Sequence, residues 1–196
     1  ATAARFENLV AYDGNDPVGI GKSLATFSAF AEGVSLYSAF AVLYSFQMRN
    51  LLKGVGQQMK WSVRDESLHS KMGCQLFRHM CSQIPGLKKE CEEHVYDAAL
   101  TMHNAEMTYI SKLFEMGDIE GITEYDLKHF IKKRTGDKLK ELGYEAEGKF
   151  GYDQKSIDKM AWFDHLTGGH THTDFFAIRP TDYSKAHEGE DFEDVW

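Results

Sequence analysis

Residues 18–46 read VGIGKSLATFSAFAEGVSLYSAFAVLYSF, and this stretch decides the fold class. Asp16 and Pro17 precede it as an N-cap residue and a first-turn proline, a pattern typical of a helix start. Apolar and aromatic residues alternate with small ones and polar residues are few, which predicts a helix covered on most sides. Its one carboxylate, Glu32, lies near the middle, where an isolated charge is costly unless it is paired or binds a metal.

The rest of the chain predicts further helices and no second folded domain. A turn near residues 49–50 precedes a long helix that continues to about residue 83, and Pro85 ends it. Thr123 and Asp126 have the spacing of a capping box, and Gly143 is a helix stop. The other predicted helices cover residues 2–12, 87–116, 123–142 and 154–162. The predicted fold class is therefore all-α, a helix bundle.

Charge and composition narrow the functional classes. The chain has 196 residues and a formal net charge of −8, and five acids without Lys or Arg lie in residues 188–196. This charge argues against a nucleic-acid binder driven by phosphate contacts. No apolar run reaches transmembrane length, so we expect a cytoplasmic protein with no membrane partner. We expect a helical domain over residues 1–165 and an irregular segment over residues 166–196 with an acidic tail.

Glu66 and His69 are three residues apart and therefore point to one side of a helix. A carboxylate and an imidazole on one face are natural ligands for a divalent transition metal, although this pair often arises by chance. Glu32 and Glu66 each lie 17 residues from a turn centred on Arg49, so an antiparallel hairpin would bring them level. Gly33 follows Glu32 and weakens the helix, which predicts a loosened or π-bulged turn there.

A complete di-iron or di-manganese bundle site needs a Glu from each of two helices and a Glu-x-x-His pair from each of two others. A second Glu-x-x-His pair is absent from the sequence. The nearest substitute, Asp126 and His129, lies on a charged helix predicted to face solvent. His170 and His172 fall in a predicted surface loop. The sequence therefore contains about half of a di-metal site.

Several stretches resemble the small, radical-generating subunit of class I ribonucleotide reductase. FAEGVSLYSAF over residues 30–40 and VRDESLH over residues 63–69 are similar to the family's last metal-ligand segments, and the 34-residue separation of Glu32 and Glu66 also fits. Three later segments resemble the family as well. They are residues 114–121, 130–134 and 174–185. The resemblance implies a ferritin-like bundle and covers nearly the whole chain.

By this resemblance, Glu32, Glu66 and His69 bind metal, either two iron ions or manganese, with iron preferred. Asp65 would accept a hydrogen bond from the imidazole of the other half's histidine, in line with how ligating histidines are oriented. Tyr183 would pass the radical to the large catalytic subunit, and the acidic C-terminal tail would dock on that subunit. Each of these two roles has a structural alternative. Asp65 could be an ordinary helix carboxylate, and Tyr183 could be a loop tyrosine with no redox role.

The resemblance covers only the C-terminal part of the family's small subunit. The family's first carboxylate ligand, first Glu-x-x-His pair and radical-bearing tyrosine lie upstream of this stretch. We expect an N-terminal fragment of the small subunit, either a separate chain or a removed segment, to supply these residues in an oligomer. Without that fragment, a large apolar face of the bundle would be exposed, as expected of an obligate interface. Two alternatives stay open: a ferritin-like di-metal oxidase subunit without radical export, and a metal-free structural partner.

Overall fold

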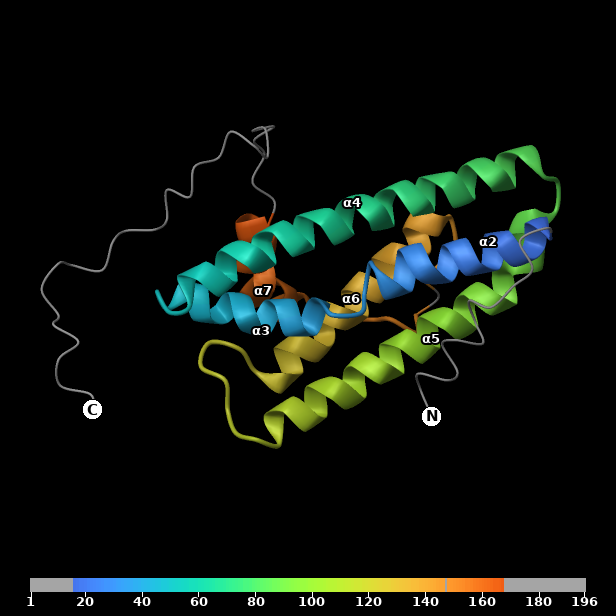
Figure 1. Ribbon diagram of the computed structural model, residues 1–196. Helices are drawn as coiled ribbons and strands as arrows, with labels where there is room; N and C mark the ends of the chain where they lie inside the picture. Colours follow the sequence, from blue (N-terminus) through green and yellow to red (C-terminus); the bar gives the residue numbers. More distant parts are fainter. Residues whose placement is uncertain (1–15, 147, 168–196) are drawn as a thin grey trace, which may run out of the picture.

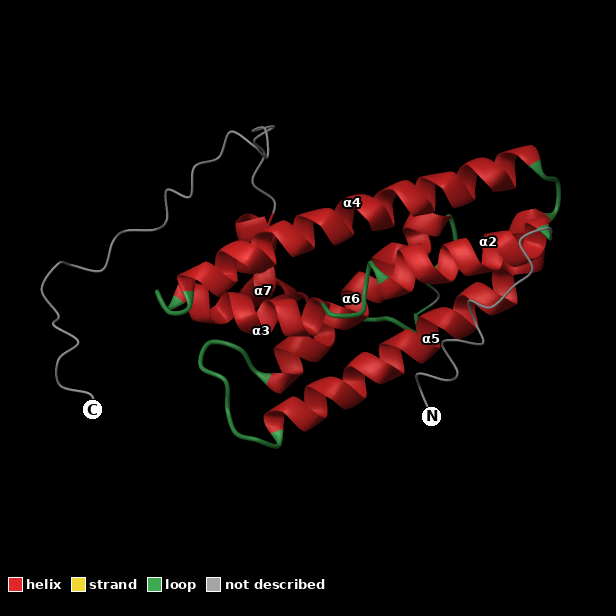
Figure 2. Ribbon diagram, in the orientation of Figure 1, coloured by secondary structure: helices red, strands yellow, loops and turns green. Residues whose placement is uncertain are grey.

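The computed structural model describes residues 16–146 and 148–167. Within these residues the backbone forms helices joined by turns, with a single isolated bridge between Ile119 and Ile122 and no strand (Figure 2). The predicted all-α fold class is confirmed. None of the described helices is long and apolar enough to cross a bilayer.

The first helical stretch is interrupted at the expected place. Helix α2 covers Pro17–Ala25, and the Asp16 carboxylate caps it by accepting hydrogen bonds from two backbone N–H groups, each at 3.0 Å. A π-helical turn, η1, follows over Thr26–Ala31, and α3 covers Tyr37–Met48. The prediction of one continuous helix over residues 18–46 is therefore wrong, whereas the predicted π-type loosening beside Gly33 is confirmed.

The helices predicted after residue 50 are present close to their predicted bounds, although the last continues past its predicted end at residue 162. The predicted helix over residues 2–12 lies outside the described residues. Helix α4 covers Lys53–Gln83, α5 covers Leu87–Phe114, α6 covers Glu124–Leu142 and α7 covers Gln154–Thr167. The stop at α6 is Gly143, whose φ of 91° is a backbone conformation that glycine adopts without a steric penalty. The predicted cap at its start is also present, because the Thr123 side chain accepts a hydrogen bond from the Asp126 N–H.

Helices α3 and α4 form the expected antiparallel hairpin. Helix α4 lies along one side of the line made by α2 and α3, and α5 lies along the other side (Figure 1). Helix α6 packs on α5, and α7 packs on α6. The core lies between these layers. Its largest fully buried side chains are Tyr37, Tyr44, Phe30, Phe77, Phe163, Leu87, Ile110, Leu127, Ile131, Leu139, Leu142 and Val34.

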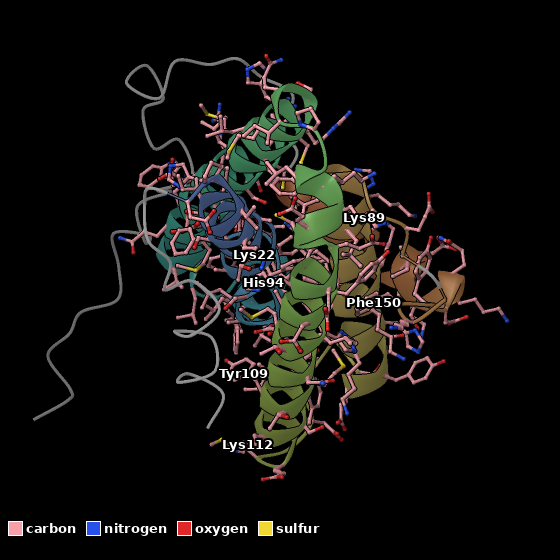
Figure 3. All side chains as sticks on the ribbon, turned by 90° about the vertical axis from the view of Figure 1, so that its right-hand side faces the viewer. Lys22, Lys89, His94, Tyr109, Lys112 and Phe150 are labelled. Atoms are coloured by element: carbon pink, nitrogen blue, oxygen red, sulfur yellow. The ribbon has the colours of Figure 1, made fainter. Side chains whose placement is uncertain are left out.

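Helix α5 closes the side of η1 and α2 that α4 does not cover. Figure 3 looks onto this helix and shows Lys22 of α2 drawn beside His94 of α5. The Oγ1 of Thr26, the first residue of η1, lies 3.0 Å from His94 Nε2. On the α6 side, the His103 ring stacks edge-on against Phe150 with centroids 5.3 Å apart. Polar and aromatic contacts thus fix α5 against both of its neighbours.

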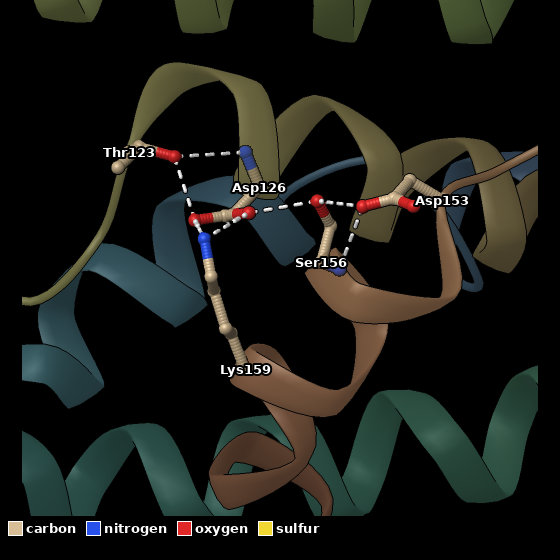
Figure 4. A network of polar contacts seen from close by, with 5 residues as sticks. All are labelled: Thr123, Asp126, Asp153, Ser156 and Lys159. Atoms are coloured by element: carbon tan, nitrogen blue, oxygen red, sulfur yellow. Dashed lines mark hydrogen bonds and ion pairs between the residues drawn. The ribbon is translucent and has the colours of Figure 1, made fainter.

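A polar network fastens α7 to the start of α6 (Figure 4). The buried Asp126 carboxylate accepts hydrogen bonds from the hydroxyls of Thr123 and Ser156, each at 2.7 Å, and from Lys159 Nζ at 3.1 Å. Burial alone would raise the pKa of Asp126, but these hydrogen bonds outweigh it and hold the pKa below its ordinary value. Nearby, His129 Nδ1 accepts a hydrogen bond from the Asp153 N–H.

The Asp126 network predicts a pH-dependent contribution to stability. Because the folded-state pKa lies below the unfolded one, this contribution is complete above the unfolded pKa and is lost as pH falls through the folded value. We expect Asp126→Asn to lower the free energy of unfolding by about 1–2 kcal/mol at pH 7. Urea unfolding at pH 7 and at a series of acid pH values measures this, and the difference between the two proteins should shrink as pH falls from about 4 through the folded pKa.

The matched control for this prediction is Asp158→Asn, an exposed aspartate on the same helix α7. It should leave the free energy of unfolding nearly unchanged at all of these pH values. If Asp126→Asn lowers the free energy of unfolding by the same amount in acid as at neutral pH, the role of the Asp126 charge is contradicted.

Candidate metal centre

The break after η1 and the α3–α4 hairpin bring three predicted ligands together. One ligand atom from each of Glu32, Glu66 and His69 lies within 4.8 Å of the other two. Glu32 comes from the end of η1, whereas Glu66 and His69 come from neighbouring turns of α4. Within the described ranges, no other group of three or more His, Cys, Asp or Glu side chains is arranged to hold a metal ion.

The electrostatics of the cluster favour a cation between its side chains. His69 Nδ1 lies 3.8 Å from Glu32 Oε1, and the Glu32 side chain is only 20% exposed. Burial raises the pKa of Glu32, the neighbouring His69 opposes that rise, and the Glu66 carboxylate adds to it. Two carboxylates that repel each other at close range are stabilised together by a positive ion.

The donor set fits a hard or borderline transition metal. Two carboxylates and one imidazole are typical ligands of iron and manganese. His69 is 51% exposed, so the cluster opens on one side of the described molecule. Three donors leave part of a metal's coordination shell to other groups. The geometry therefore fits part of a metal site, and its being half of a two-metal site stays a prediction.

Asp65 lies beside the cluster, on an exposed part of α4. Its Oδ1 is 4.0 Å from His69 Nε2, and its side chain is 72% exposed. This exposure leaves the carboxylate accessible to a histidine from another polypeptide segment. That Asp65 accepts a hydrogen bond from such a histidine stays a prediction.

The other candidate residues do not join this cluster. Asp126 and His129, the nearest substitute for a second pair, are engaged in the network between α6 and α7. Tyr183, His170, His172 and the acidic tail lie outside the described residues. The expected boundary between segments 1–165 and 166–196 falls within α7, and residues 1–15 and 168–196 of these segments are not described.

Sequence reasoning missed two charged residues near the break, of which one is buried and one is partly buried. Glu106 of α5 is 7% exposed, and its carboxylate accepts a 2.5 Å hydrogen bond from Ser38 Oγ. Burial raises its pKa, and hydrogen bonds from Ser38 and Leu36 oppose the rise. Arg134 of α6 donates from Nε to the Gly33 carbonyl at 2.6 Å. The position of Glu106 between the apolar residues Ala105 and Met107 is the sequence feature that could have indicated a buried carboxylate.

Comparison with known proteins identifies the family. Residues 4–148 match the sequence profile described as "Ribonucleotide reductase, small chain". The chain belongs to the ribonucleotide reductase small chain family. Small subunits of this family generally use a di-metal centre and pair with a large catalytic subunit. The resemblance seen in the ligand segments is thus confirmed at the level of the family.

Relatives of this small-chain family member include viral proteins. A probable ribonucleoside-diphosphate reductase small subunit of Invertebrate iridescent virus 3 is 32% identical over 189 residues, covering 94% of this chain and 49% of the relative. The subunit beta of Enterobacteria phage T4 is 27% identical over 118 residues, which cover 57% of this chain and 30% of the relative. The chain spans about half the length of the curated relatives that it matches over nearly its full extent.

A solved structure supports the ferritin-like bundle. The crystal structure of a Bacillus halodurans protein assigned to class I ribonucleotide reductase superposes with a TM-score of 0.70 at 21% identity. The match covers 84% of this chain and 56% of that one. At this identity the likeness establishes the fold, and the roles of individual residues rest on the site geometry.

Proposed function

We propose that this chain supplies Glu32, Glu66 and His69 to the di-metal centre of a ribonucleotide reductase small subunit. The observation that carries this proposal is the convergence of the three donor groups within 4.8 Å on an open face of the bundle. The assembled small subunit would generate or store the oxidant used to reduce ribonucleotides to deoxyribonucleotides. Family membership favours this function over an oxidase without radical export and over a metal-free structural partner.

Each residue would have a defined part in this function. Glu32 would hold metal from the end of η1, and Glu66 and His69 would hold it from α4. Two iron ions, or manganese, would supply the redox chemistry with O₂ when bound. Asp65 would accept a hydrogen bond from a histidine of the other half and fix its orientation. Tyr183 would relay the radical towards the large subunit.

The remaining donors would come from the N-terminal part of the small subunit, on a separate chain or on the same polypeptide. An apolar stripe on α4 flanks the ligands, because Leu68, Met72 and Leu76 recur at helical spacing and are 54%, 60% and 52% exposed. Apolar faces of this kind mark protein interfaces. The half-length match to the relatives supports the same partner.

The large catalytic subunit is the second proposed partner. The acidic tail over residues 188–196 contains the aromatic residues Phe192 and Trp196. Aromatic anchors among acidic residues suit a segment that orders on binding to its partner. We propose that this tail docks on the large subunit and that Tyr183 lies on the route between the two.

Metal analysis of two preparations tests the proposal. The chain alone should retain little iron or manganese after purification, because three donors leave the coordination shell incomplete. The chain co-expressed with the N-terminal small-subunit segment should retain about two metal ions per pair. Elemental analysis gives both values. Full occupancy in the lone chain would show that it contains further ligands, and no metal in either preparation would contradict the proposed centre.

A further inference from the structure

The helix break beside Glu32 leaves backbone groups that the helices do not satisfy. The Glu32 N–H donates to the Phe27 carbonyl at 3.0 Å, and the Ser35 N–H donates to the Phe30 carbonyl at 3.0 Å. Both bonds span five residues, as in a π-helix. Leu36 then adopts a left-handed backbone with φ of 73°, and α3 starts anew after it without a side-chain cap from within its own segment.

Two charged side chains from distant helices satisfy these groups. Arg134 of α6 donates its Nε–H to the Gly33 carbonyl at 2.6 Å. Glu106 of α5 accepts hydrogen bonds from the backbone N–H groups of Leu36 and Ser38, and from Ser38 Oγ at 2.5 Å. Buried backbone groups are costly when unpaired, and a carboxylate is favoured at the positive end of a helix. Glu106 therefore acts as the N-cap that α3 lacks.

The same arginine connects the break to the helix that carries the other ligands. The Arg134 guanidinium lies over the Tyr37 ring, 3.2 Å from its centroid. The Tyr37 hydroxyl is 2.9 Å from Ser67 Oγ, and Ser67 directly follows the proposed ligand Glu66. A chain of contacts therefore runs from the carbonyl after Glu32 to the residue after Glu66.

We propose that Glu106 and Arg134 are positioning residues that hold the break over residues 32–36 and thereby fix the direction of the Glu32 carboxylate. Arg134 acts on the Gly33 carbonyl directly after Glu32, and Glu106 acts on Leu36 and Ser38 at the end of the break. The metal part of this inference rests on the proposed function. The clamp itself rests on the hydrogen bonds alone.

Amide hydrogen exchange on the full chain tests the clamp. In Glu106→Ala, the amides of Leu36 and Ser38 should exchange at least about tenfold faster, because their acceptor is gone. Glu106→Gln keeps an acceptor oxygen and should restore part of the protection, whereas Glu106→Met fills similar space without that oxygen and should not. The matched control is Glu93→Ala, an exposed glutamate on the same helix α5.

Manganese titration tests the positioning role. Even weak Mn²⁺ binding broadens the NMR signals of nearby residues, so the lone chain at millimolar Mn²⁺ suffices. We expect Glu106→Ala to weaken Mn²⁺ binding at Glu32 and His69 by about tenfold, and Arg134→Met to do the same as a second variant. Tenfold is the lower end of the affinity loss seen when a residue that supports a metal ligand is changed. Glu93→Ala should leave the titration unchanged.

The two readouts separate the possible failures. Unchanged exchange at Leu36 and Ser38 in a folded Glu106→Ala protein would overturn the clamp. Faster exchange with undiminished Mn²⁺ binding would overturn the positioning role and leave an ordinary helix cap. Absence of Mn²⁺ binding by the unmodified chain would overturn the metal-positioning part, while exchange would still decide the clamp and metal analysis of the co-expressed pair would decide the proposed function.

Discussion

His69→Ala should remove metal retention and ribonucleotide reduction from the assembled small subunit. We expect metal affinity to fall at least about 100-fold, because removing a residue that only supports a metal ligand can already lower the affinity by that factor. Elemental analysis of the co-purified pair and the rate of deoxyribonucleotide formation with the large subunit measure the two effects. Glu66→Ala should behave in the same way.

The physical reason is the small number of donors on this side of the site. His69 provides the one imidazole among three converging groups, and its Nδ1 lies 3.8 Å from Glu32 Oε1. Without it, two carboxylates face each other and the partly buried Glu32 loses a neighbour that favours its charged form. Alanine offers no nitrogen to bind the metal.

His79→Ala provides the matched control, because His79 is an exposed histidine on the same helix α4. It should keep both metal and activity. Circular dichroism should show the same helix content in both variants. Full activity of folded His69→Ala or Glu66→Ala in the assembly would contradict the ligand assignment and favour a structural partner.

Gly73→Ala should destabilise the bundle although it adds only one methyl group. A Cβ built at Gly73 overlaps Ser28 Oγ and Ser28 Cβ, where α4 crosses η1. The Cβ atom cannot rotate away, so the helices must separate. Overpacking of this kind costs about 2 kcal/mol, which lowers the midpoint of thermal unfolding by about 4–8 °C in a chain of this size.

Two further variants isolate this contact. Gly54→Ala on the same helix meets nothing within 4 Å and should be neutral or stabilising, because alanine favours helix over glycine. In a Ser28→Gly background, the cost of Gly73→Ala should fall by at least about 0.5 kcal/mol, the coupling expected of residues in contact. Equal destabilisation with and without Ser28 would show that another neighbour is responsible.

The sequence by itself determined most of the helices and the identity of the three converging side chains that are proposed as ligands. Local signals such as the Asp16 cap and the Gly143 stop act within one or two turns, so they can be read without tertiary information. The equal spacing of Glu32 and Glu66 from the turn near Arg49 predicted their meeting because helices rise evenly along their axes. The all-α class followed from the same regularity.

Only the tertiary structure decided how Glu32 is presented. Gly33 predicted a loosened helical turn. The extent of the π turn and the left-handed backbone of Leu36, however, depend on partners from other helices. Those partners, Glu106 and Arg134, are separated from their hydrogen-bonding residues by 68 and 101 positions. Local sequence patterns do not report such pairings, because they form only when α5 and α6 pack against the break and bury its unpaired backbone groups.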